Sequence, residues 1–343
     1  MVLEDPDGRT VGWGLADAGD IAIRVLGTDA PQDLSRVLVE RIGRADGVRQ
    51  RLVLPGTDAW RSVAAAGDGL PGLVVDRYGD IAVLRVYAEA WVPHLDCVVA
   101  AIRRLPWVST VYRRYGVTRV DNREGGETLF GPEPPDKLVI REGGMSMLVR
   151  PKVGQKTGLF LDQREHRALI GRWAAGRLVA NLFSYTGGFS VAAALGGAAR
   201  VVTVDIAPEA VADARENFVL NGLEPDHHAF VVADAFAWEP RGRLDLLIVD
   251  PPSLARRKAS EGAARSAYRK LHRRLGPFVA RDGLLATSSC TARLDLDGWR
   301  RAIREGLDGP WSWHHLSIEP PDHPVSLGHR EGHYLKFALL RRR

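Results

Sequence analysis

The second half of the chain alternates short apolar runs with segments of helical spacing. An apolar run at 176–183 ends in a glycine turn at 184–188, and apolar positions at helical spacing continue through 189–195. The next run, 200–204, is rich in β-branched residues, as buried strands are, and ends in the carboxylate of Asp205. This order of strand, tight turn, helix and strand predicts one βαβ unit of a doubly wound α/β fold.

The residues of this unit indicate what it could bind. Gly187 and Gly188 lack a Cβ, so the backbone can approach a ligand closely, and Asp205, 18 residues after Gly187, is placed to accept hydrogen bonds from two ribose hydroxyls. The turn has neither the dinucleotide fingerprint G-x-G-x-x-G nor a P-loop lysine. A ligand with a ribose but no pyrophosphate fits better, and S-adenosylmethionine is one. A strand at 230–233 ends in a further acid, Asp234. Any doubly wound α/β domain could carry such a turn, so a domain with a different function stays open at this point.

Two later strands also end in residues capable of chemistry. The apolar run 244–249 is followed by Asp250-Pro251-Pro252, and the run 283–289 by Cys290. Because two prolines stiffen the backbone at the carboxyl end of a parallel strand, Asp250 is presented rigidly to the ligand crevice. The same edge should hold Cys290. The Asp250-Pro251-Pro252 sequence could be a purely structural loop, and Cys290 could be a small buried residue. Because both lie at the same edge of the predicted sheet, we favour the interpretation that Asp250 is a functional acid and Cys290 a nucleophile.

The first half of the chain predicts smaller elements without visible chemistry. A β-like segment at 3–27 has its clearest strand at 21–25, and helical spacing follows at 34–45. Residues 72–87 form two strands around Tyr78-Gly79-Asp80, a hairpin by its turn chemistry. A helix at 93–105, in which Cys97 lies among apolar neighbours as a core residue, and strands at 108–115 and 145–150 complete a compact α/β module that ends near Pro151.

A dense mixture of apolar and charged residues at 158–167 precedes the second half. Asp162 and Glu165 have the spacing of a helix cap and its capping-box partner. That interpretation does not account for Gln163, Arg164 and Arg167, which we therefore consider as site residues.

Composition limits the class of protein. At 343 residues and 45% hydrophobic content, the chain is long enough for about two domains with real cores. It shows no apolar run of membrane-spanning length and no signal peptide at its start, so we expect a cytoplasmic protein that does not enter a membrane. The cysteines Cys97 and Cys290 match no metal spacing, so neither a disulfide framework nor a metal site is expected.

The charge balance favours an anionic partner. Lysine and arginine number 47 against 42 acidic residues, and the isoelectric point is near 9.4. Arginine-rich surfaces are also often only solvated, so clustering carries more weight than the net charge. The basic residues chosen as RNA contacts are Arg113, Arg114, Arg119, Arg256, Arg257 and Lys258.

From about Asp68 to its end, the chain resembles the RlmI-type family of bacterial 23S ribosomal RNA cytosine C5 methyltransferases, which use S-adenosylmethionine. Several motifs in the family's order carry the resemblance. They are Asp68-Gly69-Leu70-Pro71-Gly72, Lys156-Thr157-Gly158, Leu161-Asp162-Gln163-Arg164, Phe183-Ser184-Tyr185-Thr186-Gly187-Gly188-Phe189, Asp250-Pro251-Pro252, Ser289-Cys290, Asp322-His323-Pro324, Glu331-Gly332 and Tyr334-Leu335-Lys336.

The resemblance implies a domain order and a cofactor pocket. It divides the chain into a PUA-like β segment at 1–28 that lacks the family's earlier strands, a helical linker at 29–67, a central α/β domain at 68–151 and a Rossmann-like class I methyltransferase domain at 152–343. The incomplete PUA segment leaves RNA affinity and site selection open. The implied S-adenosylmethionine contacts are Phe160, Gln163, Arg167, Asn181, Phe183, Ser184, Tyr185, Thr186, Gly187, Asp205, Ile206, Asp234, Ala235, Asp250 and Pro252.

The resemblance also implies a mechanism. Cytosine C5 is a weak nucleophile, and the family is understood to add a cysteine thiolate to C6, a role that falls to Cys290 with Asp250 on the base's N3 and N4 edge. Arg164, Arg167 or the cofactor's sulfonium would support the thiolate. The target base must leave its stack, which favours a flexible loop of 23S RNA.

Two alternatives stay open. In the first, Asp250-Pro251-Pro252 binds an exocyclic amine that is methylated, and Cys290 is incidental. In the second, the chain is an RNA-binding protein with a vestigial cofactor site. The sequence does not name the nucleotide modified, the base that removes the C5 proton, or whether the substrate is naked RNA or a particle. It leaves a homodimer open as well.

Overall fold

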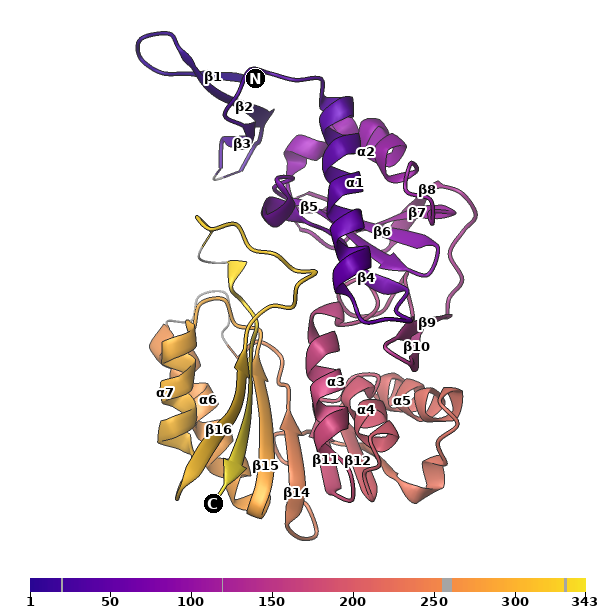
Figure 1. Cartoon of the computed structure of the whole chain (residues 1–343), viewed down its shortest axis with the longest axis vertical. Coiled ribbons are helices and arrows are strands. Elements are labelled where there is room, and N and C mark those ends of the chain that lie inside the picture. Colours follow the sequence, from indigo (N-terminus) through magenta and orange to yellow (C-terminus); the bar gives the residue numbers. More distant parts are fainter. Residues whose placement is uncertain (20, 119, 255–260, 330–331) are drawn as a thin grey trace. The chain divides into compact units, whose positions relative to one another are not determined.

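The computed structural model describes residues 1–343 except 20, 119, 255–260 and 330–331. The described residues divide into two compact units. The first comprises 1–144, 149–161 and 321–329, and the second comprises 145–148, 162–320 and 330–343. Figure 1 labels their helices and strands. No helix among the described residues has both the length and the apolar character needed to cross a membrane.

The first unit begins with a small antiparallel sheet. Its strands are β1 (Val2–Glu4), β2 (Thr10–Ala16) and β3 (Ile23–Gly27), and β2 lies in the middle. The predicted strand at 21–25 is thus shifted by two residues. Trp13 of β2 is buried, and its indole Nε1 donates to Asp29 Oδ1 at 3.3 Å.

A five-stranded sheet forms the body of the first unit. Its order is β4-β5-β6-β7-β8, and only the β6–β7 pair is parallel. The hairpin predicted around Gly79 is confirmed, since Gly79 has a φ of 62° between β5 and β6. The bounds are β4 Ala59–Ala64, β5 Leu73–Tyr78, β6 Ile81–Val86, β7 Thr110–Arg114 and β8 Gly126–Phe130.

Helices pack against this sheet and share its core. Helix α1 (Leu34–Leu52) begins at the cap Asp33, whose side chain accepts the amide of Arg36, and α2 spans Leu95–Ile102. Short 3₁₀ helices lie at Ala65–Asp68 and Glu89–His94, so the predicted helix at 93–105 divides into two elements. The region 29–67, which the sequence analysis treated as a helical linker with helical spacing at 34–45, contains α1 and also the strand β4. Cys97 is partly buried against this core and accepts a hydrogen bond from Ser35.

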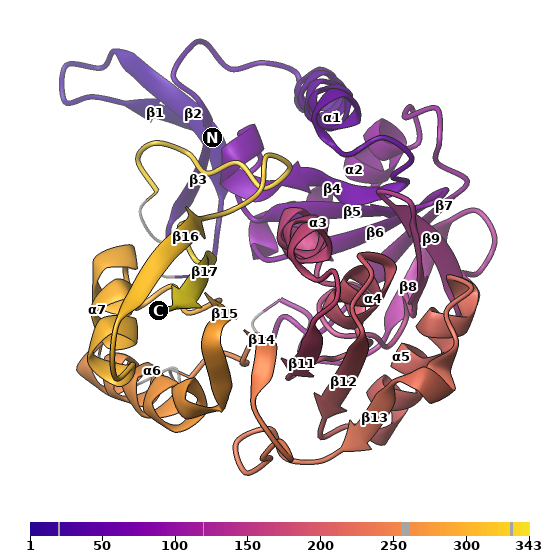
Figure 2. The ribbon, with the colours of Figure 1, turned by 60° about the horizontal axis from the view of Figure 1, so that its bottom comes forward.

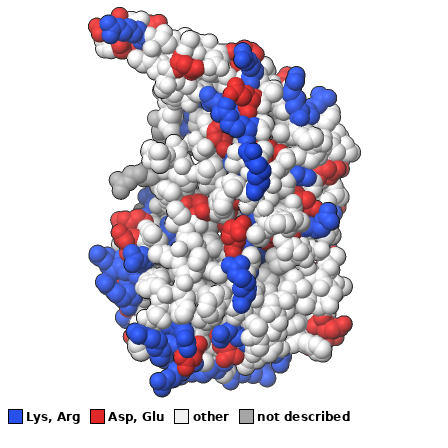
Figure 3. Space-filling model, in the orientation of Figure 1, with Lys and Arg blue, Asp and Glu red and all other residues white. Residues whose placement is uncertain are grey.

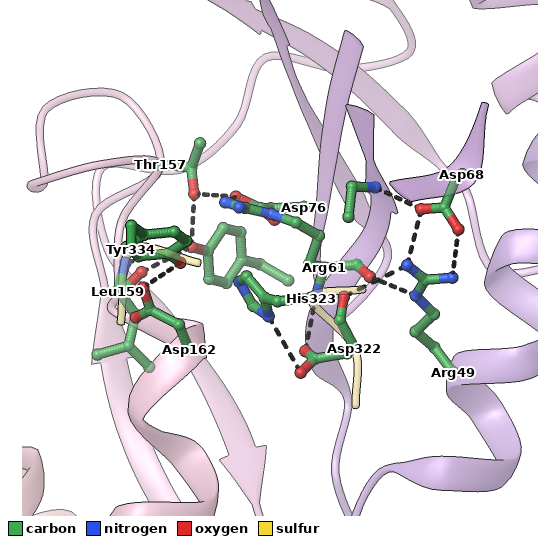
Figure 4. Close-up of polar contacts among 12 residues, drawn as sticks. Arg49, Arg61, Asp68, Asp76, Thr157, Leu159, Asp162, Asp322, His323 and Tyr334 are labelled. Carbon is green, nitrogen blue, oxygen red and sulfur yellow. Dashed lines mark hydrogen bonds and ion pairs between the residues drawn. The ribbon is translucent and has the colours of Figure 1, made fainter. Parts of the chain in front are cut away.

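Hydrogen bonds from Arg49 and Arg61 to Asp322 anchor residues 321–329 within the first unit (Figure 4). Arg49, 2% exposed, forms a bidentate pair with Asp68 in which both nitrogen–oxygen distances are 2.7 Å. Asp322 is fully buried, and its carboxylate accepts the backbone amide of Arg61 at 3.2 Å. The Asp322-His323-Pro324 motif therefore belongs to the first unit, although it follows most of the second unit in the sequence.

The described residues of the second unit form a seven-stranded sheet in the order β13-β12-β11-β14-β15-β17-β16. The strands from β13 to β15 are parallel, whereas β17 is antiparallel to both of its neighbours. The bounds are β11 Leu178–Leu182, β12 Arg200–Asp205, β13 Ala229–Val232, β14 Leu244–Val249, β15 Val279–Ser289, β16 Trp311–Ser317 and β17 Lys336–Arg342. A separate two-stranded sheet is made of β9 (Leu138–Glu142) and β10 (Met145–Val149).

Helices cover both faces of the seven-stranded sheet, which confirms the predicted doubly wound α/β fold (Figures 1 and 2). On one face lie α3 (Arg164–Trp173), α4 (Gly188–Leu195) and α5 (Pro208–Leu220), and on the other lie α6 (Glu261–Leu275) and α7 (Leu296–Gly306). Proline at the start of α5 and the sequence Asn221-Gly222 after it mark its limits. Short 3₁₀ helices occur at Leu161–Gln163, Pro225–His227 and Gly276–Phe278.

Candidate functional site

The turn between β11 and α4 is held in a backbone conformation that few residues adopt. Phe183, Tyr185 and Gly187 have φ values of 58°, 49° and 75°, and two of these are not glycine. The Ser184 amide donates to the carbonyl of Val204 at 3.0 Å, and the Gly187 amide donates to the carbonyl of Ser184 at 2.9 Å. Left-handed backbone outside glycine is costly and is often found at ligand sites. The turn is therefore fixed in shape by its own contacts.

Asp205 lies next to this turn at the end of β12. One carboxylate oxygen accepts the amide of Tyr185 at 2.7 Å, and the other accepts the amide of Ala207 at 3.0 Å. Each ionised oxygen can accept more than one hydrogen bond, so both retain capacity for a ligand hydroxyl. This geometry suits a pair of vicinal ribose hydroxyls.

Two buried polar atoms beside the turn lack a hydrogen-bond partner among the described residues. They are Asn181 Oδ1, at the end of β11, and Thr186 Oγ1, within the turn. Asn181 is fully buried, and its amide nitrogen donates to Ser190 Oγ at 3.0 Å, so its orientation is fixed. Since buried polar atoms are normally paired, these two atoms fit a polar ligand bound at the turn.

The carboxyl ends of β12 and β13 together present an acid and exposed apolar side chains. Asp234 is exposed and accepts the amide of Phe236 at 2.9 Å, while Ala235 is buried. Ile206 is 69% exposed and Phe236 43%, and the Phe236 ring packs edge-on against Phe183 at 4.8 Å between centroids. An acid beside apolar surfaces suits an adenine ring and its amine. The sequence analysis missed Phe236, although an aromatic residue two positions after Asp234 was a usable signal.

Adjacent strands bring Asp250 and Cys290 to the same edge of the sheet. In the parallel pair β14–β15, Val249, the last residue of β14, lies opposite Thr287, and β15 continues for two more residues to Ser289 before Cys290. Ser288 Oγ donates to Asp250 Oδ1, which ties the two strand ends to each other. Cys290 is partly exposed. An acid and a thiol thus lie at the edge that also holds Asp205.

A chain of buried side chains holds Asp250 in place. Gln163 Nε2 donates to Asp250 Oδ1 at 3.1 Å, and Gln163 Oε1 lies 2.5 Å from His166 Nδ1. Burial lowers the pKa of His166 to about 3, so the ring is neutral at physiological pH and the Gln163 carbonyl assigns its proton to Nδ1. His166 Nε2 then accepts from Ser317 at 2.9 Å. The structure therefore places Gln163 against Asp250, where it orients the carboxylate.

The other predicted cofactor residues lie in different surroundings. Arg167 is buried behind the turn, where a Cβ on Gly188 would lie 2.9 Å from its Cδ, and Pro252 is exposed after Asp250. Phe160 belongs to the first unit, and the Lys156 ammonium lies 4.7 Å from the centroid of its ring.

The predicted RNA contacts differ in accessibility. Arg113 is 6% exposed and pairs with Asp121 at 2.9 Å and Glu127 at 3.5 Å, so its guanidinium already has acidic partners. Arg114 is partly exposed. Arg119, Arg256, Arg257 and Lys258 lie outside the described residues.

A second basic surface was missed from the sequence. Exposed Arg300, Arg301 and Arg304 of α7, together with Asp297 and Trp313, line a pocket of about 410 Å³. In Figure 3, basic side chains gather over the region where Figure 1 shows α7. Arginines beside an aromatic ring suit the phosphates and bases of a polynucleotide.

The strained turn, the acid after β12 and the second acid after β13 define the chain as a Rossmann-like methyltransferase that uses S-adenosylmethionine. A family model described as S-adenosylmethionine-dependent methyltransferase matches residues 105–296. The chain is also similar to a crystal structure of a protein assigned as a methyltransferase in complex with SAH, with a TM-score of 0.86, 28% identity and coverage of 99% of this chain and 90% of that one.

Curated relatives narrow the family further. A Deinococcus radiodurans protein named "Ribosomal RNA large subunit methyltransferase" is 36% identical over 99% of this chain and 88% of its own length. "Ribosomal RNA large subunit methyltransferase I" of Shewanella amazonensis is 34% identical over 98% and 88%, respectively. The chain belongs to the RlmI-type family of methyltransferases, which confirms the resemblance drawn from the motifs.

Proposed function

We propose that the chain methylates C5 of a cytosine in 23S ribosomal RNA. Its relatives are named for the large ribosomal subunit RNA, which supports RNA as the substrate class. The observation that carries the choice of reaction is the joint position of Asp250 and Cys290 at the edge that holds the nucleoside site. A methyltransferase that acted on an amine would have no use for a thiol at that position.

Cys290 acts as the nucleophile on the base. Its thiolate adds to C6, a sulfur–carbon bond forms, and the electron pair of the C5–C6 double bond moves onto C5. Asp250 accepts a hydrogen bond from the exocyclic amine of cytosine, and Gln163 and Ser288 keep its carboxylate in a fixed orientation. Later loss of the C5 proton returns an electron pair to the ring and expels the Cys290 thiolate.

The residues beside the β11–α4 turn would hold the cofactor. Asp205 would bind its ribose, Asp234 its adenine amine, and Ile206 and Phe236 the faces of its adenine ring, while Asn181 and Thr186 offer polar atoms to the rest. When bound, S-adenosylmethionine supplies an electrophilic methyl group for C5. The remaining residues of the second unit that the family resemblance implies stay assigned to this pocket; they are Arg167, Phe183, Ser184, Tyr185, Gly187, Ala235 and Pro252.

The substrate must present an unstacked cytosine, because C6 is reached only from the face of the base. A single-stranded loop or bulge meets this requirement at low energetic cost. Arg114, Arg119, Arg256, Arg257 and Lys258 are proposed to bind its phosphates.

The test is transfer of a labelled methyl group from S-adenosylmethionine to unmodified 23S RNA, followed by nucleoside analysis. The wild type should place label in 5-methylcytidine, Cys290→Ala should place none, and Cys97→Ala, the matched change at the other cysteine, should retain the reaction. Label in an N-methylated base that survives Cys290→Ala would reject the thiolate mechanism and favour amine methylation at Asp250-Pro251-Pro252. Cofactor binding without transfer to any RNA would favour a vestigial site.

A further inference from the structure

Lys336 places a buried ammonium group beside the segment that carries Cys290. It is the first residue of β17 and lies opposite Ser289, the residue before Cys290, in the antiparallel β15–β17 pair. Its Nζ donates to the carbonyl of Thr291 at 3.0 Å and to the carbonyl of Leu294 at 2.8 Å. The side chain is only 2% exposed. The ammonium thus contacts the residue that directly follows Cys290.

This charge has no carboxylate at ion-pair distance among the described residues. Burial lowers the pKa of Lys336, and negative charge on Glu319, Cys290 and Asp295 acts against that shift. Glu319 already accepts from the amide of Leu335 at 2.8 Å and lies 3.0 Å from His333. Asp295 caps α7 by accepting the amide of Gly298 at 2.7 Å.

A buried cation that contacts only neutral carbonyls gains stability when a nearby group becomes an anion. Of the three groups whose negative charge acts on Lys336, only Cys290 is neutral in its ordinary protonation state at neutral pH. The gain is reciprocal, since a cation that is stabilised by an anion favours the ionised form of its partner.

We propose that Lys336 stabilises the thiolate form of Cys290 and so keeps the nucleophile ready for attack. It acts through Cys290 as a positioning residue and transfers no proton. The need for a thiolate rests on the proposed cytosine C5 reaction, whereas the ionisation itself can be measured without RNA or cofactor.

The experiment follows the rate of alkylation of Cys290 by iodoacetamide as a function of pH, in the full chain with Cys97→Ala so that one thiol is observed. The wild-type rate should have its midpoint below about 8.5, the ordinary value for a thiol. Lys336→Met should raise the midpoint by about one pH unit or more, which slows alkylation about tenfold at pH 7. Lys336→Arg keeps the charge and should stay near the wild-type midpoint.

Tyr268→Phe is the matched control for the shape of the same segment. The Tyr268 hydroxyl lies 3.2 Å from Thr291 Oγ1 and also interacts with Cys290, so its removal loosens the segment without removing the ammonium. The midpoint should therefore move less than in Lys336→Met. If Lys336→Met fails to fold, Lys336→Gln keeps donors for the two carbonyls and removes the charge, and it should show the same rise.

Equal midpoints in the wild type and the neutral variants would overturn the proposal and leave Lys336 a structural role. A raised midpoint together with the absence of 5-methylcytidine in the RNA assay would uphold the role of Lys336 and reject the proposed reaction. The two proposals therefore fail by different measurements.

Discussion

Asp205→Asn should weaken the binding of S-adenosylmethionine, and the hydrogen bonds of the Asp205 carboxylate indicate by how much. In the wild type, each carboxylate oxygen accepts one backbone amide, from Tyr185 at 2.7 Å and from Ala207 at 3.0 Å. The asparagine amide has only one oxygen, so in either orientation its NH₂ group faces one of these N–H groups. The variant therefore loses a backbone hydrogen bond as well as an acceptor for one ribose hydroxyl.

The lost ribose contact and the lost backbone hydrogen bond can be measured separately. A hydrogen bond to a charged group contributes about 1.5–3 kcal/mol, so loss of the ribose contact should raise the Kd roughly tenfold to 150-fold. The unpaired backbone N–H should lower the free energy of unfolding by about 1–3 kcal/mol. Isothermal titration calorimetry measures the first effect and urea unfolding the second.

Asp234→Asn is the matched control. Asp234 is exposed, and its carboxylate accepts the backbone amide of Phe236, which the asparagine oxygen can still accept. This variant should lose cofactor affinity with its unfolding free energy unchanged. If Asp205→Asn binds the cofactor within threefold of the wild type, Asp205 does not contact the ribose and the site assignment is wrong.

Three further predictions concern the nucleophile, the pH dependence and the first unit. With 23S RNA that contains 5-fluorocytidine and with S-adenosylmethionine, the wild type should form a complex that survives denaturing electrophoresis, because fluorine cannot leave C5 as a proton does, and Cys290→Ala should form none. Burial lowers the pKa of His272 to about 4, below its unfolded value, so urea unfolding should show stability lost as the pH falls from about 6.5 to 4, and His272→Gln should flatten that slope. Arg49→Met should cost about 3–5 kcal/mol of unfolding free energy because it leaves the Asp68 carboxylate buried without its ion pair, and a change below 1 kcal/mol would reject that argument.

The local elements of the methyltransferase unit could be predicted from the sequence because their signals lie within a few residues. The glycine turn after β11, the β-branched run of β12 and the proline and glycine that bound α5 each act through neighbouring backbone. Gln163 was selected from the sequence, but its contact with Asp250 was not, since 87 positions separate the two residues.

The strand β4, within 29–67, was not predicted from the sequence, although the helix before it was. Strand β4 contains Arg61 and Ser62 between apolar residues, which hides the strand, and its place in the sheet comes from pairing with β5. The membership of 321–329 in the first unit had no local signal at all. It depends on tertiary contacts such as the bond from the Arg61 amide to the buried carboxylate of Asp322.

The chemistry of the proposed site depends on the mixed direction of the strands around β15. Because β14 runs parallel to β15, its carboxyl end brings Asp250 to the end of β15. Because β17 runs antiparallel, its amino end brings Lys336 to the same place from the other side. A fully parallel sheet would have placed the first residue of β17 at the opposite edge, a strand length of roughly 20 Å away. The mixed strand directions therefore place a cation from β17 and an acid from β14 near the end of β15 that leads to Cys290. In the proposed reaction, the cation would offset the repulsion between that carboxylate and a thiolate.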